Sequence, residues 1–143
     1  MENCYVHRGS SVTVKTGKNK LSTIRVDVLK SALDNKKINK RFLEILTVNG
    51  FSPVILIEEA NQKSLIKVTL EDGNYIQVSH NVKFMLIDKS LVKAKSLNLS
   101  HVLFQRKKIK QIEEIEAPSG FQMFSIQMKS ENKIYIDNIA IQI

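Results

Sequence analysis

Tight-turn sequences divide this 143-residue chain into short apolar runs, and this division constrains its fold more than any other feature. Asn49-Gly50 and the sequence Glu-Asp-Gly-Asn at residues 71–74 each lie between runs rich in Ile and Val. β-Branched residues favour strands, and Asn-Gly and Asp-Gly favour the turns of β-hairpins. The pattern predicts two successive hairpins, built from strands at residues 42–48, 53–57, 64–70 and 75–78.

The rest of the chain continues this pattern of short elements. Val12 and Val14 alternate with polar residues, as they do in a half-buried strand. A helix capped by Ser22 or Thr23 is predicted next, with its end at Asp34. The remaining predicted elements are a turn at residues 16–19, a short amphipathic segment at 90–99, and strands at 102–105, 121–128 and 134–141.

Residues 106–118 differ from their surroundings because they change from basic to acidic side chains and end in Pro118. This segment could be a strand edge, a linker or both, and we interpret it as a linker, or as a region where the chain could be split. With 43% hydrophobic residues, the chain is long enough to bury one core and short for two. The expected architecture is a single all-β domain over residues 1–143, with one or two short helices.

Cysteine content and hydropathy limit the classes of function further. Cys4 is the only cysteine, so an internal disulfide is impossible, and no Cys/His cluster has metal-ligand spacing. We therefore predict no metal and no cofactor. No run is apolar enough for a membrane span or a signal peptide, so we expect a soluble protein in the cytoplasm of its host, cellular or viral in origin.

A nucleic-acid partner is a weaker alternative, suggested by the net charge of +8. Stacking of bases needs aromatic side chains beside the cations, yet aromatic residues make up 6% of the chain. Only Phe42 adjoins the basic cluster. That cluster comprises Lys36, Lys37, Lys40 and Arg41.

Four segments resemble, in the same order, the motifs of inteins and other Hint domains. Residues 67–76 and 78–84 resemble the central motif, in which a strand, an acidic-Gly turn and a second strand lead to Thr-x-x-His. Gly9-Ser10-Ser11-Val12 is similar to the first motif, and residues 123–128 and 134–141 are similar to the last two. The compact phage inteins that lack a homing endonuclease are the most similar. The resemblance implies the Hint fold, a horseshoe of β-hairpins that brings both ends of the domain together.

The N-terminal chemistry of this family is only partly present at the matching positions. Splicing begins when a Cys or Ser attacks the preceding carbonyl; the candidate here is Cys4, although the spacing to the first motif favours Tyr5. The Thr and His of the central motif polarise and protonate the scissile peptide. Ser79 can replace the Thr, but the His position falls on Val82. His80 could substitute only through a β-bulge.

The C-terminal chemistry departs further from the family pattern. The final His-Asn pair, in which the Asn side chain cyclises, falls on Gln142 and Ile143. Isoleucine has no amide nitrogen, so cleavage by this route is excluded at that position. Ser125 stands where the family has an acidic residue near the final strands.

Two functions within the protein-splicing lineage follow from these substitutions. The first is a catalytically silent Hint domain that acts as a structural or interaction module, with flanking or host polypeptide segments as its partners. The second is residual N-terminal auto-processing, an acyl shift through Cys4 supported by Ser79.

Overall fold

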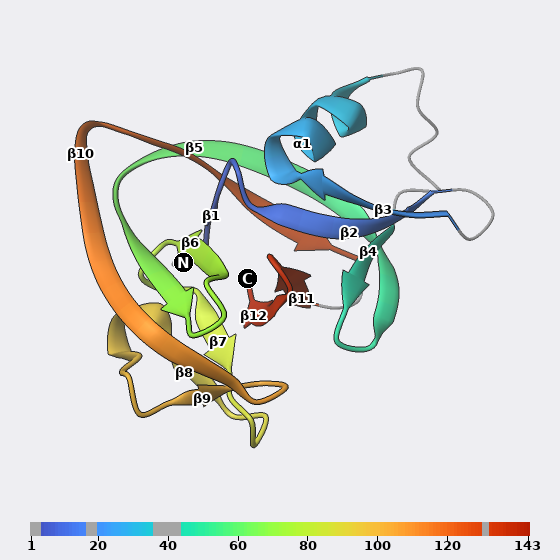
Figure 1. Ribbon diagram of the computed structural model, residues 1–143. Helices are drawn as coiled ribbons and strands as arrows, with labels where there is room; N and C mark the ends of the chain where they lie inside the picture. The colour runs from blue at the N-terminus through green and yellow to red at the C-terminus, as the bar shows by residue number, and fades with distance from the viewer. Residues whose placement is uncertain (1–3, 17–19, 36–43, 130–131) are drawn as a thin grey trace.

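The computed structural model describes residues 4–16, 20–35, 44–129 and 132–143 (Figure 1). Within these residues, twelve strands join into one antiparallel sheet accompanied by one α-helix, which confirms the all-β class. The elements are β1 (Val6–His7), β2 (Ser11–Thr16), β3 (Lys20–Arg25), α1 (Val26–Asp34), β4 (Glu44–Thr47), β5 (Gly50–Leu70), β6 (Tyr75–Val78), β7 (Lys83–Met85), β8 (Leu91–Lys93), the 3₁₀ turn η2 (Ala94–Ser96), β9 (Val102–Leu103), β10 (Lys107–Met128), β11 (Lys133–Ile136) and β12 (Ile139–Gln142).

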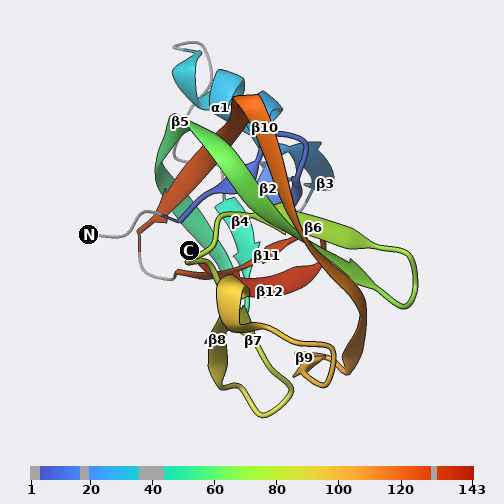
Figure 2. The ribbon, with the colours of Figure 1, turned by 90° about the vertical axis from the view of Figure 1, so that its left-hand side faces the viewer.

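Two long strands, β5 and β10, form the curved frame of the molecule. They run antiparallel from the pair Ile109–Leu70 to the pair Met128–Val54, and both ribbons bend through a wide arc (Figures 1 and 2). Their length corrects two expectations. Residues 53–57 and 64–70 belong to one strand, and the segment at 106–118 is mostly strand, not a linker, because β5 supplies hydrogen-bonding partners along it.

Elements near the two ends of the chain are inserted between strands that are distant in sequence. Val6 of β1 pairs with Val78 of β6 on one side and with Phe124 of β10 on the other. β12 lies between β11 and β7 in the same way. The chain ends are therefore held by long-range pairing.

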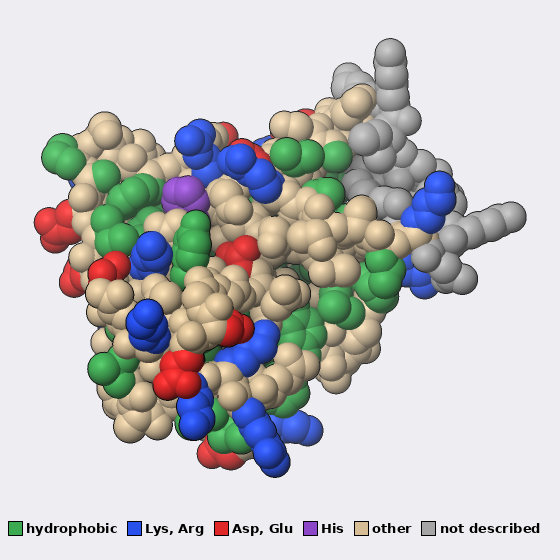
Figure 3. Space-filling view, viewed as in Figure 1, with side chains coloured by type: hydrophobic (Ala, Val, Ile, Leu, Met, Phe, Trp, Pro, Cys, Tyr) green, Lys and Arg blue, Asp and Glu red, His purple; other side chains and the backbone are tan. Residues whose placement is uncertain are grey.

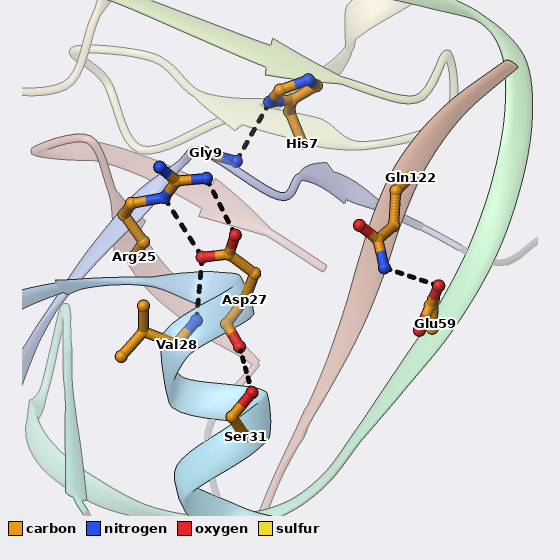
Figure 4. Close-up of polar contacts among 8 residues, drawn as sticks. All are labelled: His7, Gly9, Arg25, Asp27, Val28, Ser31, Glu59 and Gln122. Atoms are coloured by element: carbon orange, nitrogen blue, oxygen red, sulfur yellow. Dashed lines mark hydrogen bonds and ion pairs between the residues drawn. The ribbon is translucent and has the colours of Figure 1, made fainter.

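The helix begins at Val26, which is later than a cap at Ser22 or Thr23 predicts. Residues 20–25 instead form β3, which pairs along its whole length with β2. Arg25 takes the N-cap position without a capping side-chain bond, and its guanidinium lies 2.8 Å from the Asp27 carboxylate. Asp27 Oδ1 also accepts the N–H of Val28 at 2.8 Å (Figure 4), so an acidic side chain satisfies one free donor of the first turn. The predicted end at Asp34 is confirmed.

The predicted hairpins are confirmed, with small shifts in position. β6 has its predicted bounds. In the β4–β5 hairpin the turn residues are Val48 and Asn49, because Thr47 pairs with Gly50, whose φ is +101°. The Thr47 hydroxyl closes this turn by donating to the Gly50 carbonyl at 2.5 Å.

The predicted strand at residues 134–141 is instead a hairpin, β11–β12. Its turn residues, Asp137 and Asn138, have φ values of +51° and +64°, which Asn and Asp tolerate better than other non-glycine residues. Asp137-Asn138 is a turn signal between the two arms, and the sequence analysis did not use it.

The core lies inside the curve of the frame and under α1. Its largest fully buried side chains include Phe84, Phe124, Leu29, Ile45 and Ile134. No helix in the described ranges is long and apolar enough to cross a membrane.

Candidate functional site

A cavity of about 610 Å³ opens where residues from both ends of the sequence come together. A volume of this size is typical of small-ligand and peptide side-chain sites. The frame supplies one part of its lining, and β7, β8 and β12 supply another. The lining residues are Cys4, Leu56, Glu58, Asn81, Lys83, Lys93, Ser125, Ile126, Gln127, Met128, Asn132, Gln142 and Ile143.

Ser79, which follows β6, lies beside the segment that leads from Cys4 into β1. The Cys4 thiol is half-buried and donates to the carbonyl of Asn81 over 3.5 Å. Ser79 is 6% exposed, and its hydroxyl accepts the N–H of Tyr5 at 2.8 Å. The N–H of Ser79 in turn donates to the Tyr5 carbonyl at 2.9 Å. Ser79 therefore holds the backbone on the C-terminal side of Cys4.

Val82, which the motif resemblance matches to the family's proton-transferring histidine, is a core residue. Its side chain has no exposed surface, and its carbonyl accepts the N–H of Ala94 at 2.7 Å. An isopropyl group can neither donate nor accept a proton.

His80 points toward the frame and not into the cavity. Its Nε2 lies 2.9 Å from the Glu114 carboxylate, on the part of β10 that pairs with Ile66. It is absent from the cavity lining.

The other matched positions do line the cavity. Ser125 lies on β10 in register with Glu58, and Gln142 lies on β12 in register with Lys83. The N–H of Ile143 donates to the carbonyl of Asn132 at 3.1 Å. The structure thus brings together Cys4, Ser125, Gln142 and Ile143, with Ser79 adjacent through Tyr5.

Two further predictions concern charge and metals. The basic cluster from Lys36 to Arg41 lies outside the described residues. In the part of the chain that the structure describes, no three His, Cys, Asp or Glu side chains group as they would around a metal ion.

A second polar cluster, centred on Asp137, was not foreseen from the sequence. Asp137 Oδ1 accepts the backbone N–H of Ser11 at 2.9 Å and its hydroxyl at 3.1 Å, and the Asp137 carbonyl accepts Asn74 Nδ2 at 2.6 Å. Burial raises the pKa of the Asp137 carboxyl, although the bonds from Ser11 oppose the shift. Burial, and next the charge of Arg8, lower the pKa of nearby His7. A 240 Å³ recess beside them is lined mainly by polar residues.

His7 also supports the loop between β1 and β2. Its Nδ1 accepts the N–H of Gly9 at 3.0 Å (Figure 4). On the frame, Gln122 of β10 donates to the carboxylate of Glu59 of β5 at 2.6 Å in the same view. These contacts fix the entry of β2 and the pairing of the frame strands, and they take no part in the cavity.

Comparison with solved structures finds inteins. The VidaL intein (selenomethionine variant) superposes with a TM-score of 0.80 at 17% identity, covering 99% of this chain and 97% of that chain. The gp41-1 intein gives 0.72 at 19% identity, covering 99% and 100%. A DnaB intein from Synechocystis sp. PCC 6803 gives 0.75 at 14% identity, covering 97% of each chain.

No protein-family model matches the sequence, and no curated protein matches it. The structural likeness extends over nearly the full length, and it confirms the fold expected from the four motifs. Because the sequence identities are below one fifth, the likeness establishes a shared fold and does not establish a shared activity. The chain therefore has the Hint fold that these inteins share.

Proposed function

We propose that this Hint domain is catalytically silent and acts as a structural or interaction module for polypeptide segments that adjoin it. The observation that carries the proposal is the full burial of Val82, the residue that the motif resemblance matches to the proton-transferring histidine. General acid catalysis needs a titratable group within hydrogen-bond reach of the leaving nitrogen. His80 is the nearest imidazole in sequence, and it is held by Glu114.

The C-terminal positions support the same proposal. Cyclisation requires a side-chain amide nitrogen that attacks the carbonyl of its own residue, and Ile143 has none. Gln142 supplies an amide that does not titrate, in place of the family's histidine. Both residues line the cavity, so the site keeps its shape while it lacks these groups.

The test uses a fusion with one reporter domain before Cys4 and another after Ile143. We expect the intact mass to stay unchanged after prolonged incubation with dithiothreitol, because neither end can be released. A splicing-active intein in the same fusion serves as the positive control. Release of either reporter at a rate above that of a Cys4→Ala fusion would contradict the proposal.

Residual N-terminal processing is the second candidate, favoured by the cavity-facing thiol of Cys4 and by the bond from Tyr5 to Ser79. In this reaction Cys4 Sγ, losing its proton, attacks the carbonyl carbon of the preceding residue. The C–N bond breaks, the Cys4 nitrogen gains a proton as a free amine, and the acyl group stays on Cys4 Sγ as a thioester. An added thiol then attacks the thioester carbonyl and displaces the Cys4 thiolate, which releases the preceding segment. Thiol-dependent release that is lost in Cys4→Ala and slowed in Ser79→Ala would establish this candidate instead.

A further inference from the structure

The polar recess beside Asp137, of about 240 Å³, is separate from the cavity that Cys4 lines, because no residue lines both. Its walls come from β1, the loop after β1, the β5–β6 turn, β6 and the β11–β12 turn. Segments from the start, the middle and the end of the chain therefore build it together. The lining residues are His7, Gly9, Ser10, Asn74, Tyr75, Gln77 and Asp137.

His7 supplies the recess with a hydrogen-bond donor. Its Nδ1 accepts the N–H of Gly9 at 3.0 Å, so the neutral imidazole carries its hydrogen on Nε2. Burial first, and then the charge of Arg8, lower the pKa of His7, which favours this neutral form. Among the residues that the structure describes, none accepts a hydrogen bond from Nε2 of His7.

Three other lining residues supply acceptors. A carboxylate has about four acceptor sites, and the Asp137 carboxylate uses three of them for the N–H and hydroxyl of Ser11 and the side chain of Ser10. Asn74 donates Nδ2 to the Asp137 carbonyl, which leaves Asn74 Oδ1 as an acceptor. The Gln77 amide forms no hydrogen bond with any residue in the described ranges, so both its oxygen and its nitrogen are available.

The charges around the recess favour a ligand without net charge. An anion would be repelled by the Asp137 carboxylate, and a cation would leave the Nε2–H of His7 without an acceptor. The Lys67 ammonium already lies over the Tyr75 ring, 4.5 Å from its centroid, and would repel a second cation there. Over the part of the surface where β1 and β6 lie, Lys and Arg side chains are interspersed with Asp and Glu side chains (Figure 3).

We propose that the recess binds the side-chain carboxamide of a glutamine residue in a polypeptide partner. The carboxamide oxygen accepts the Nε2–H of His7, and its two N–H groups donate to the remaining site of the Asp137 carboxylate and to Asn74 Oδ1. A hydroxyl ligand has a single hydrogen and so satisfies only one of these acceptors. The inference rests on the proposed function, since it gives the interaction module a chemical group to recognise.

The test is a titration of the full chain at pH 7, followed by NMR through the His7 imidazole and the Gln77 side-chain amide. The probe is N-acetyl-glutamine methylamide. It is compared with the same derivatives of glutamate, lysine, homoserine and methionine, which share its backbone amides. We expect the glutamine probe to bind about tenfold more tightly than each of the others, because it alone supplies one acceptor and two donors without net charge.

Two variants remove groups from the recess. Gln77→Leu removes an amide that has no partner among the described residues, and it should weaken binding about fivefold. Asp137→Asn keeps an oxygen for Ser11 and removes the carboxylate, and it should weaken binding about tenfold. The matched control is Gln127→Leu, since Gln127 is exposed on β10 and lines the other cavity, and this variant should bind like the parent. Unchanged thermal unfolding midpoints establish that the variants remain folded.

Several results would overturn the inference. These are no change in the His7 signals, equal affinity for the glutamine and methionine probes, tighter binding of any charged or hydroxyl probe, or an equal effect of Gln77→Leu and Gln127→Leu. The reporter fusion separates this inference from the proposed function. Reporter release with probe binding intact contradicts only the silence of the domain, whereas no release and no probe binding contradicts only the inference.

Discussion

Asp137 connects three segments through its side chain and its backbone, and its carboxyl group is poorly solvated. Its side chain accepts two bonds from Ser11, its own N–H donates to the Ser11 carbonyl at 2.9 Å, and its carbonyl accepts Asn74. The start of β2, the β5–β6 turn and the β11–β12 turn therefore meet at one residue. Burial disfavours the ionised form, which raises the pKa of this carboxyl.

Asp137→Asn should change how stability depends on pH. A carboxyl whose pKa is higher in the folded than in the unfolded state keeps its proton longer when folded, so stability falls as pH rises between the two pKa values. The amide removes this loss and tolerates the positive φ. We therefore expect the free energy of unfolding of the variant, relative to the parent, to increase from about pH 4 to about pH 7 in urea titrations.

Asp88→Asn is the matched comparison, and we expect its stability relative to the parent to change with pH in the opposite direction. Hydrogen bonds from the hydroxyl and N–H of Ser90 lower the pKa of the Asp88 carboxyl, so its contribution is present above the unfolded pKa and lost as pH falls. This variant should lose stability relative to the parent as pH rises. If both variants change in the same direction, the assignment of the slope to Asp137 is wrong.

At the scale of elements, β10 stays one strand because a bulge absorbs the residues that break its pattern. Glu116 pairs with Ser64 and Phe121 pairs with Gln62, so residues 117–120 stand opposite a single residue of β5. The bulge contains Pro118 and ends at Gly120, whose φ is +85°. Asn61 Nδ2 donates to the carbonyl of Ser119 at 3.3 Å across it. Such bulges bend a strand, as the arc of the frame requires.

Gly120→Ala should destabilise the protein for two reasons that can be separated. The left-handed φ costs a side chain about 1–2 kcal/mol, and the new Cβ would lie 1.7 Å from Asn61 Oδ1. Gly73→Ala is the matched control, since Gly73 has a φ of +90° and nothing within 4 Å of the added carbon. Chemical denaturation should show a larger loss for Gly120→Ala than for Gly73→Ala.

Adding Asn61→Ala to Gly120→Ala removes the clash and leaves the backbone cost. The double variant, referred to Asn61→Ala alone, should therefore lose about the same stability as Gly73→Ala, about 1–2 kcal/mol. If the second substitution gives no recovery, Asn61 is not what limits the space at Gly120.

At the scale of the whole molecule, the sheet is interleaved. β1 is inserted between β6 and β10, β12 is inserted between β7 and β11, and β5 extends from the β4 hairpin to the β6 hairpin. No set of strands next to each other in sequence can therefore bury its apolar face alone. Stability should be shared across the chain instead of residing in two halves.

We expect one cooperative unfolding transition over residues 1–143. Far-ultraviolet circular dichroism and tyrosine fluorescence should give coincident midpoints, as they do for single domains of this size. Two separated transitions would contradict the single-domain interpretation. Because most pairings are distant in sequence, refolding should also be slow, in the range of milliseconds to seconds.

Sequence reasoning predicted the all-β class, the hairpins and the resemblance to the Hint fold. It missed the length of β5 and β10, because a strand that bends carries the same pattern of apolar residues as a straight one. It also missed the β11–β12 turn, although Asp137-Asn138 is a pair that favours turns. For the candidate site, it named Cys4, Ser79, Ser125, Gln142 and Ile143 from the motifs. It missed Lys83 and Lys93 as lining residues, since only the register of β7 and β8 pairs the two residues.

The sequence by itself determined which groups are available for chemistry, because the side chain at Val82 or Ile143 is fixed by its covalent structure whatever the fold. It also determined where the chain can turn, because Gly, Asn and Asp relieve local steric limits that act over a few residues. Only the tertiary structure decided which groups meet. Strand order and register depend on contacts between distant residues, and they placed Cys4 and Ile143 in the lining of one cavity, brought His80 to Glu114 and paired Lys83 with Lys93.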